Sequence, residues 1–326
     1  MTVPYLLRLL CLSMASFFLV NAVAGLAASF VSRRAIRFAE TMRPRSAARF
    51  LFTLRLLPLV LGAGAVLGLC IPSYFWLEPE GTPERVGFAC LALVVLGAAS
   101  WSVSVARIAR AFAASVRCNR LWRQAGQEAC LPGEISKVTI VEKETPLLAL
   151  AGVLRPRLVV SRCVLGALSA EQLDVVLYHE NAHRTSHDNL KRLFLLLAPD
   201  PIPFVFGFSR IEHAWAKFTE WAADDEAARG DSQRALTLAA ALLRVARMGA
   251  GPRLSFLHTS LVAGSDDLSA RVDRLLCLEP ARPQSPPLAH FFMRGAALLM
   301  AGTVAVLMIL PATLSSVHQL LELFLH

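Results

Sequence analysis

The chain has 326 residues, of which 55% are hydrophobic and only 17% are charged, and its mean hydropathy is +0.52. Soluble domains carry roughly 25% charged residues, so this composition argues against an ordinary soluble protein and favours one that uses a lipid bilayer as part of its solvent. The net charge of +9 raises the question of nucleic acid as a partner, but the arginines flank apolar runs and form no nucleic-acid-binding motif, so none is expected. The seven cysteines are odd in number and contain no C-x-x-C pair, which argues against a disulfide framework and a cysteine zinc site.

Four segments are apolar over about 20 residues or more, the length that crosses a bilayer as a helix. They are Tyr5–Val31, Phe50–Leu77, Val86–Ala106 and Phe291–Val317. Arg8, Arg55 and Arg294 lie near segment ends, where a long side chain can extend to the interface. A cleaved signal peptide is the alternative for the first segment, because residues 22–24 (AVA) resemble a cleavage site. The long apolar run and the six arginines that follow it favour a retained span.

The charges between these segments predict the orientation. Six arginines and a single acid, Glu40, lie between the first two spans, three glutamates and one arginine between the next two, and five arginines follow the third span. Positive loops stay in the cytoplasm, so both termini are expected outside. The sequence therefore predicts an N-terminal membrane domain with three transmembrane helices at 1–106, a cytoplasmic domain at 107–290, and a C-terminal transmembrane helix at 291–326.

The region 107–290 is predicted to be a mixed α+β domain. Lys137–Glu142 alternates polar and apolar residues as a half-buried strand does, and Arg157–Ser161 is a second short β-branched run. Ser169 with Gln172 forms a capping box that opens a helix to about His183. The proline-broken segment Leu190–Phe208 is expected either to touch the bilayer surface or to join the core. Two further helices are predicted, at 210–229 and 232–248.

The predicted helix after Ser169 carries the motif H-E-x-x-H. His179 and His183 are four residues apart and share one helix face, so both imidazoles can reach a single Zn²⁺ while Glu180 between them holds a water molecule. A catalytic zinc needs a third protein ligand. Glu220 on the next predicted helix can supply it, and Asp224, one turn further, can accept a hydrogen bond from the outer nitrogen of a ligand histidine.

These residues resemble the gluzincin pattern H-E-x-x-H … E-x-x-x-D and, more narrowly, the BlaR/MecR family of membrane zinc metallopeptidases, the signal transducers of β-lactam resistance. The resemblance covers roughly residues 140–280 and the order of three spans, zinc domain and fourth span. It includes Leu154–Ser161, Leu168–Leu190, Glu220–Ala227 and Arg271–Leu276. The best-known members carry an extracellular penicillin-binding sensor after the last span, whereas this sequence ends at His326, so β-lactam sensing by this chain alone is not expected.

The resemblance implies a zincin-like domain in a multi-pass protein of the bacterial inner (cell) membrane. It makes His179, His183 and Glu220 the zinc ligands and Glu180 the catalytic base. Asp224 and Asp188 then orient the ligands from outside. Membrane peptidases that trim misfolded membrane proteins or prenylated substrates share the same short motifs and remain analogues.

Two function classes stay open. The first is a membrane-embedded zinc endopeptidase that cleaves a cytoplasmic or membrane-proximal protein in signal transduction or regulated proteolysis, with a transcriptional repressor among the candidate substrates. Membrane-protein quality control is a variant of this class. The second is a zinc-binding signalling or scaffold protein without catalysis. Glu180 favours an enzyme, because a scaffold has no need of it. The sequence does not indicate the oligomeric state.

Several further residues carry expectations that a structure can test. Leu154–Ser161 is considered as a strand that pairs with an extended substrate. Asp200 is expected in a turn, Glu212 on a solvated or interfacial face, and Asp225 facing solvent. A second donor for the oxyanion is sought among four side chains: Tyr178, His258, Arg271 and Arg274.

Overall fold

The computed structural model describes residues 5–77, 87–129, 138–142, 146–153, 156–200, 207–249, 259–260, 265–277, 315–316 and 319. Over these residues the protein is mostly helical, with one small five-stranded sheet. The coarse prediction of long apolar helices together with a small sheet is therefore confirmed.

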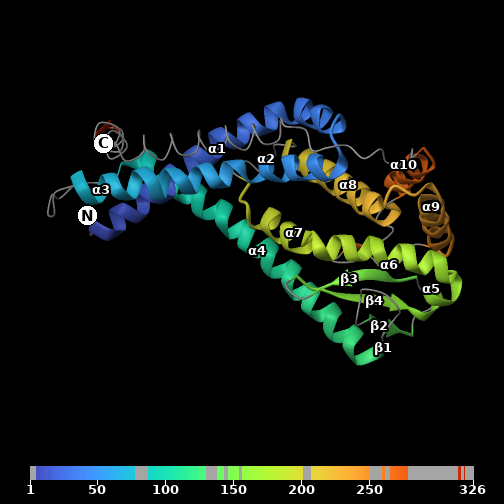
Figure 1. The fold of residues 1–326 in the computed structure, drawn as a ribbon. Helices are drawn as coiled ribbons and strands as arrows, with labels where there is room; N and C mark the ends of the chain where they lie inside the picture. The colour runs from blue at the N-terminus through green and yellow to red at the C-terminus, as the bar shows by residue number, and fades with distance from the viewer. Residues whose placement is uncertain are drawn as a thin grey trace.

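Among the residues that the structure describes, three helical segments are long and apolar enough to cross a membrane (Figure 1). The first is α1 (Tyr5–Glu40), and the third is α4 (Phe88–Ala125). The second runs without a break through α2 (Pro44–Ala65), a π-helical stretch (Val66–Cys70) and α3 (Ile71–Leu77). They coincide with the first three predicted spans. The fourth predicted span lies outside the described residues apart from 315–316, and it stays a prediction.

The membrane helices extend well past the predicted spans. The 36 residues of α1 and the 38 residues of α4 correspond to about 54 and 57 Å, whereas the hydrocarbon core of a bilayer is roughly 30 Å thick. In Figure 1, α1 and α2 run along one side, α4 diverges from them, and the sheet and later helices lie between. The predicted boundary at 106/107 falls inside α4, and the division into three parts stays a prediction.

Small residues let the membrane helices approach closely. A Cβ atom on Gly62 of α2 would lie 3.0 Å from the Phe17 ring of α1. A Cβ atom on Gly97 of α4 would lie 3.1 Å from Met14 of the same helix α1. Helix α1 therefore packs against both other membrane segments through glycine contacts.

The sheet follows α4 directly. Its strands are β1 (Gly126–Ala129), β2 (Val138–Val141), β3 (Leu148–Ala151), β4 (Arg157–Ser161) and β5 (Thr259–Ser260). Their order is β1-β2-β4-β3-β5; β2 and β4 are parallel, and the other pairs are antiparallel. The helix gives way to β1 at Gly126, where a Cβ atom would lie 2.5 Å from Thr139 of β2.

The two predicted strands are present as β2 and β4, but the proposed role of Leu154–Ser161 in binding a substrate strand is wrong. β4 lies inside the sheet, with β2 on one side and β3 on the other. Its backbone groups are therefore engaged along both edges, and an added strand has no edge there to pair with.

Both faces of the sheet are covered by helices. On one face, β-strand residues such as Val160 pack against α5 (Arg162–Ala167), α6 (Ala170–Thr185), α9 (Ser232–Arg247) and α10 (Ser265–Leu276). On the other face, Val141 and Val159 pack against Trp122 near the end of α4. The end of the third membrane segment is thus part of the core of the following domain.

The helix predicted from the capping box is α6. The Ser169 hydroxyl accepts from the backbone N–H of Gln172, and the Gln172 side chain accepts from the backbone N–H of Ser169. His187 adopts a left-handed conformation with φ of 55°, which separates α6 from α7 (Asp188–Leu197). Helix α8 (Gly207–Ala228) and α9 correspond to the two further predicted helices.

Helices α7 and α8 connect this domain to the membrane helices. Leu195 of α7 and Phe208 of α8 share a buried cluster with Leu51 of α2. The described part of Leu190–Phe208 therefore packs against membrane-crossing helices, while residues 201–206 lie outside the described residues.

The expectation that Arg8 and Arg55 extend to the membrane interface is wrong. Arg55 does not extend to the interface: it is 1% exposed and pairs with Asp200 and with Glu212. Glu212, expected on a solvated or interfacial face, is partly exposed and contacts α2 through Arg55. Asp200, expected in a turn, also pairs with Arg55, and the turn itself stays a prediction. Arg8 is buried as well, at 3% exposure. A long side chain near a helix end can be drawn inward when the fold offers carboxylate partners, which a linear pattern does not reveal.

Candidate metal centre

The three motif residues of α6 are all buried. His179 and Glu180 are 0% exposed and His183 is 1% exposed. The helix begins at its capping box and packs one face on the sheet through Val175 and Val176. His179 and His183, one turn apart, present their Nε2 atoms to each other at 3.2 Å.

Helix α8 packs against α6 and brings Glu220 to the two imidazoles. One Glu220 oxygen lies 3.6 Å from His179 Nε2, and the other lies 3.6 Å from His183 Nε2. Zinc bonds of 2.0–2.1 Å in a tetrahedral arrangement place neighbouring ligand atoms about 3.3 Å apart. The three side chains therefore fit one zinc ion, and they form a group of buried residues able to hold a metal ion.

The outer nitrogen of each imidazole faces a carboxylate. His179 Nδ1 lies 3.0 Å from Asp224 Oδ1, and His183 Nδ1 lies 2.9 Å from Asp188 Oδ2. A carboxylate favours the tautomer that carries hydrogen on Nδ1 and so leaves a lone pair on Nε2. The two Nε2 atoms, 3.2 Å apart, need a proton or a metal ion between them. Burial lowers the pKa of both histidines, but Asp224 and Glu220 around His179, and Glu220 and Asp188 around His183, raise both pKa values overall, so the centre attracts positive charge. The donor set therefore suits a divalent metal.

Arg271 of α10 holds the two carboxylates of α8. Its Nε donates to Asp224 Oδ2 at 2.9 Å and its Nη2 to Asp224 Oδ1 at 2.7 Å, while Nη1 lies 3.2 Å from Glu220. Burial tends to raise the pKa of Glu220, but His183, His179 and Arg271 together hold it well below its usual range. Glu220 is thus an ionised ligand candidate at neutral pH.

Glu180 differs from the other carboxylates of the centre. Among the residues that the structure describes, no donor reaches either of its oxygens. Burial raises the pKa of Glu180 to about 7, although the neighbouring histidines oppose the shift. A fully buried carboxyl without a partner is costly, which indicates that another group belongs beside it. A water molecule next to a metal ion fits that position.

The structure brings together every residue of the predicted site. His179, His183 and Glu220 bring their ligand atoms together, Glu180 is buried next to His179 and interacts electrostatically with all three, and Asp224 and Asp188 contact the two histidines from outside. Their roles in binding zinc and in catalysis stay predictions.

Two basic residues at the centre were missed or misread from the sequence. Arg271 was considered as an oxyanion donor and as part of the segment Arg271–Leu276, but its pairing with Asp224 was not predicted. Arg192 of α7 lies close to three carboxylates of the site: burial lowers its pKa, and Glu220, Asp188 and Glu180 counteract this. The one signal in the sequence is spacing: Arg192 lies four residues after Asp188, so on a helix the two side chains share a face.

The other candidate oxyanion donors are engaged elsewhere. Arg274 pairs with Asp225, so Asp225 does not simply face solvent as expected. The Tyr178 ring is covered by the guanidinium groups of Arg229 and Arg234. His258 lies outside the described residues.

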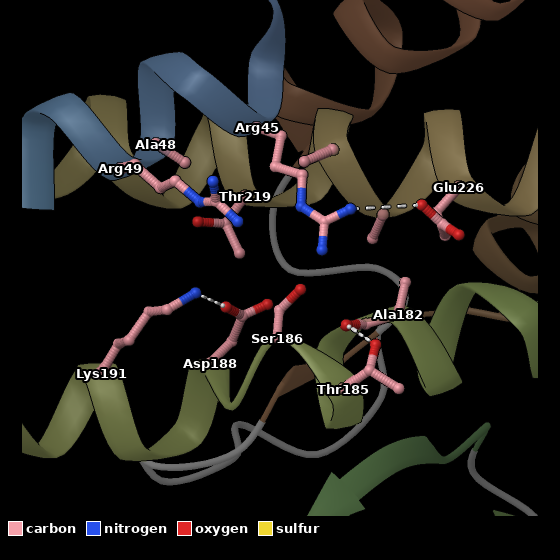
Figure 2. A pocket seen from close by; sticks show the side chains of 12 residues that line it. Arg45, Ala48, Arg49, Ala182, Thr185, Ser186, Asp188, Lys191, Thr219 and Glu226 are labelled. Carbon is pink, nitrogen blue, oxygen red and sulfur yellow. Dashed lines mark hydrogen bonds and ion pairs between the residues drawn. The ribbon is translucent and has the colours of Figure 1, made fainter. Parts of the chain in front are cut away.

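A cavity of about 250 Å³ lies beside the centre, between α2, α6, α7 and α8 (Figure 2). Arg45 and Arg49 face Lys191 and Asp188 across it. Lys191 donates to Asp188 Oδ1 at 2.8 Å, so the carboxylate that contacts His183 also forms part of this wall. The cavity therefore adjoins the outer side of the metal centre, and Asp188 is the residue they share.

Comparison with known proteins assigns no family. No family model matches the chain, and a search of curated proteins finds no match. Among solved structures the chain is similar to the crystal structure of S. mikatae Ste24p, with 12% sequence identity and a TM-score of 0.33. The match covers 79% of this chain and 98% of that chain. An identity and a TM-score this low carry no functional argument, and the function is therefore argued from the site.

Proposed function

We propose that the chain is a membrane-embedded zinc-dependent endopeptidase. The observation that carries the proposal is the buried group of His179, His183 and Glu220 with the unpartnered carboxyl of Glu180 beside it. Zincins combine two histidines of one helix with a third ligand from a later element and a glutamate that acts as general base. The apolar helices α1 to α4 support a location in a membrane.

The residues divide the work of peptide hydrolysis among them. His179, His183 and Glu220 would hold the zinc ion, which on binding activates a water molecule and polarises the scissile carbonyl. Glu180 accepts a proton from the water molecule while the water oxygen attacks the carbonyl carbon. Glu180 then delivers that proton to the leaving nitrogen as the C–N bond breaks. Asp224 and Asp188 keep both imidazoles in the tautomer that coordinates through Nε2.

Burial raises the pKa of Glu180 above the usual range of a carboxyl, which favours a group that can take up a proton, as a general base must. The proposed substrate is a cytoplasmic or membrane-proximal protein. The arginine distribution supports a cytoplasmic catalytic domain, and the sequence resemblance to BlaR/MecR peptidases supports regulated proteolysis with a repressor as one candidate substrate.

Glu180→Gln tests the proposal. The amide keeps the size of the side chain but cannot accept the proton, so the purified variant is expected to bind one Zn²⁺ like the wild type and to lose hydrolysis of an unfolded protein substrate. Glu171→Gln is the matched control, because Glu171 lies in the first turn of the same helix and is exposed. Hydrolysis that persists in Glu180→Gln would contradict the mechanism, and intact zinc binding without any wild-type hydrolysis would favour a non-catalytic zinc protein.

A further inference from the structure

A second group of charged side chains joins the membrane helices to the elements of the metal centre. Arg55 of α2 donates from Nη2 to Asp200 Oδ1 at 2.6 Å and from Nε to Glu212 Oε1 at 2.7 Å. Arg107 of α4 donates from Nη1 to the other Asp200 oxygen at 2.6 Å. Arg55 is 1% exposed, so its guanidinium is almost completely removed from solvent. We call Arg55, Arg107, Asp200 and Glu212 the arginine cluster.

Backbone contacts hold the same segment, residues 198–200. The Asn21 side chain of α1 donates to the Pro199 carbonyl at 3.3 Å, and the Ser100 hydroxyl of α4 donates to the Asp200 carbonyl at 3.1 Å. Both arginines of the cluster also donate to the Ala198 carbonyl at 3.3 Å. All three membrane-crossing segments therefore contact the short stretch that follows α7.

The residues held in this way lie at the far ends of the elements that build the metal centre. Helix α7 begins at Asp188, which contacts His183, and ends at Leu197, three residues before Asp200. Helix α8 carries Glu212 eight residues before Glu220. A single guanidinium, that of Arg55, thus holds both the segment after α7 and the first half of α8.

The geometry of these contacts favours a fixed arrangement. An arginine presents its donors in a planar fork, and charge-assisted hydrogen bonds of 2.6–2.7 Å are strong and directional. Helix α7 has only ten residues, about 15 Å, so a shift of its end moves its beginning as well. Helix α7 therefore connects the arginine cluster to Asp188, and α8 connects it to Glu220.

We propose that Arg55 and Asp200 are positioning residues through which the membrane helices set the geometry of the metal centre. They act through α7 on Asp188 and His183, and through α8 on Glu220. The inference rests on the proposed function, since it concerns the same centre. It predicts that a change far from the ligands alters how the ligands hold a metal ion.

Titration of the purified full chain in detergent with Co²⁺ tests the inference, because the visible absorption of Co²⁺ reports the geometry of its ligands. Asp200→Asn removes the charge that both arginines contact. This variant is expected to weaken Co²⁺ binding about tenfold and to change the absorption spectrum. Loss of a residue that contacts a ligand directly lowers metal affinity about 10–100-fold, and Asp200 acts on the ligands only through α7, so its effect should lie at the lower end of that range. Arg55→Lys should change the spectrum in the same way, since one ammonium group cannot reproduce the fork.

Glu226→Gln is the control, because Glu226 also lies on α8 but forms only an exposed pair with Arg45 at 3.7 Å. Its Co²⁺ affinity and spectrum should match the wild type. If Asp200→Asn yields no folded protein, Glu212→Gln, which removes a single ion pair, provides the same measurement. An Asp200→Asn or Glu212→Gln protein with lower thermal stability but unchanged Co²⁺ affinity and spectrum would overturn the inference.

The outcomes separate this inference from the proposed function. A wild-type protein that binds no Co²⁺ contradicts the proposed function itself, and the positioning role falls with it. A wild-type centre that binds Co²⁺ and hydrolyses substrate, but does not respond to the cluster variants, contradicts the positioning role alone.

Discussion

The metal centre and the arginine cluster are both buried groups of charges, but they are balanced differently. In the arginine cluster two arginines face two carboxylates, so the protein supplies its own counter-charges. At the metal centre four carboxylates (Glu180, Asp188, Glu220 and Asp224) lie close to two imidazoles, and Lys191, Arg192 and Arg271 contact this group from outside. Two imidazole nitrogens also face each other there. The comparison teaches that the first group pairs its own charges, whereas the second also brings three ligand atoms close enough together that they could hold a metal ion.

Removing a proposed ligand gives the largest expected effect. Glu220→Gln takes away the carboxylate that lies 3.6 Å from both Nε2 atoms. Replacing a residue that only hydrogen-bonds to a ligand lowers metal affinity by up to roughly 100-fold. Because Glu220 is itself a proposed ligand, we expect zinc affinity to fall by more than this and hydrolysis to be lost. Zinc titration of the purified variant measures this. Wild-type zinc affinity in Glu220→Gln would show that the centre does not use this carboxylate.

The next largest effect is expected from Arg271→Gln. This change leaves Asp224, which is 0% exposed, without its two arginine hydrogen bonds. Breaking a buried ion pair from one side costs about 3–5 kcal/mol. Thermal or denaturant unfolding should therefore show a large loss of stability. The double variant with Asp224→Asn should recover part of it, because no unpaired charge remains; equal stability of the single variant and the wild type would contradict the pairing.

A smaller effect is expected from Asp188→Asn, which weakens the partner of His183 Nδ1 without touching a ligand atom. Zinc affinity should fall about 10–100-fold while one ion per chain still binds at saturation. Competition with a chelator of known affinity measures the change. A loss of stoichiometry instead of affinity would mean that Asp188 itself coordinates the metal.

The smallest effect is expected from Glu226→Gln at the wall of the cavity. The Arg45–Glu226 pair is exposed at both ends, at 62% and 58%, and exposed ion pairs contribute little. The free energy of unfolding should stay within about 0.5 kcal/mol of the wild type. A larger loss, measured by unfolding, would show that the cavity depends on this pair.

The metal centre was foreseeable because much of its geometry is local. The i, i+4 spacing of His179 and His183 places both imidazoles on one helix face whatever the rest of the fold does. The capping box at Ser169 fixes where that helix begins. The choice of Glu220 and Asp224 followed from the same spacing rule on a second helix and from the resemblance to a known pattern.

The arginine cluster was not foreseeable for the opposite reason. Arg55 and Glu212 are 157 residues apart, and Arg55 and Asp200 are 145 residues apart, so no periodicity connects them. Each residue alone had a plausible local reading, as an interfacial arginine, a solvated glutamate and a turn aspartate. Only the packing of α8 against α1 and α2 changed those readings.

The amino-acid sequence alone determined the apolar membrane segments and the helix that carries His179, Glu180 and His183, because hydrophobic length, capping and helical spacing act over a few residues. Tertiary structure decided which carboxylates meet these histidines, that β4 lies inside the sheet, and that Arg271 and Arg55 hold the surrounding elements. These contacts join residues distant in the chain, and their geometry exists only once the helices and the sheet have packed together.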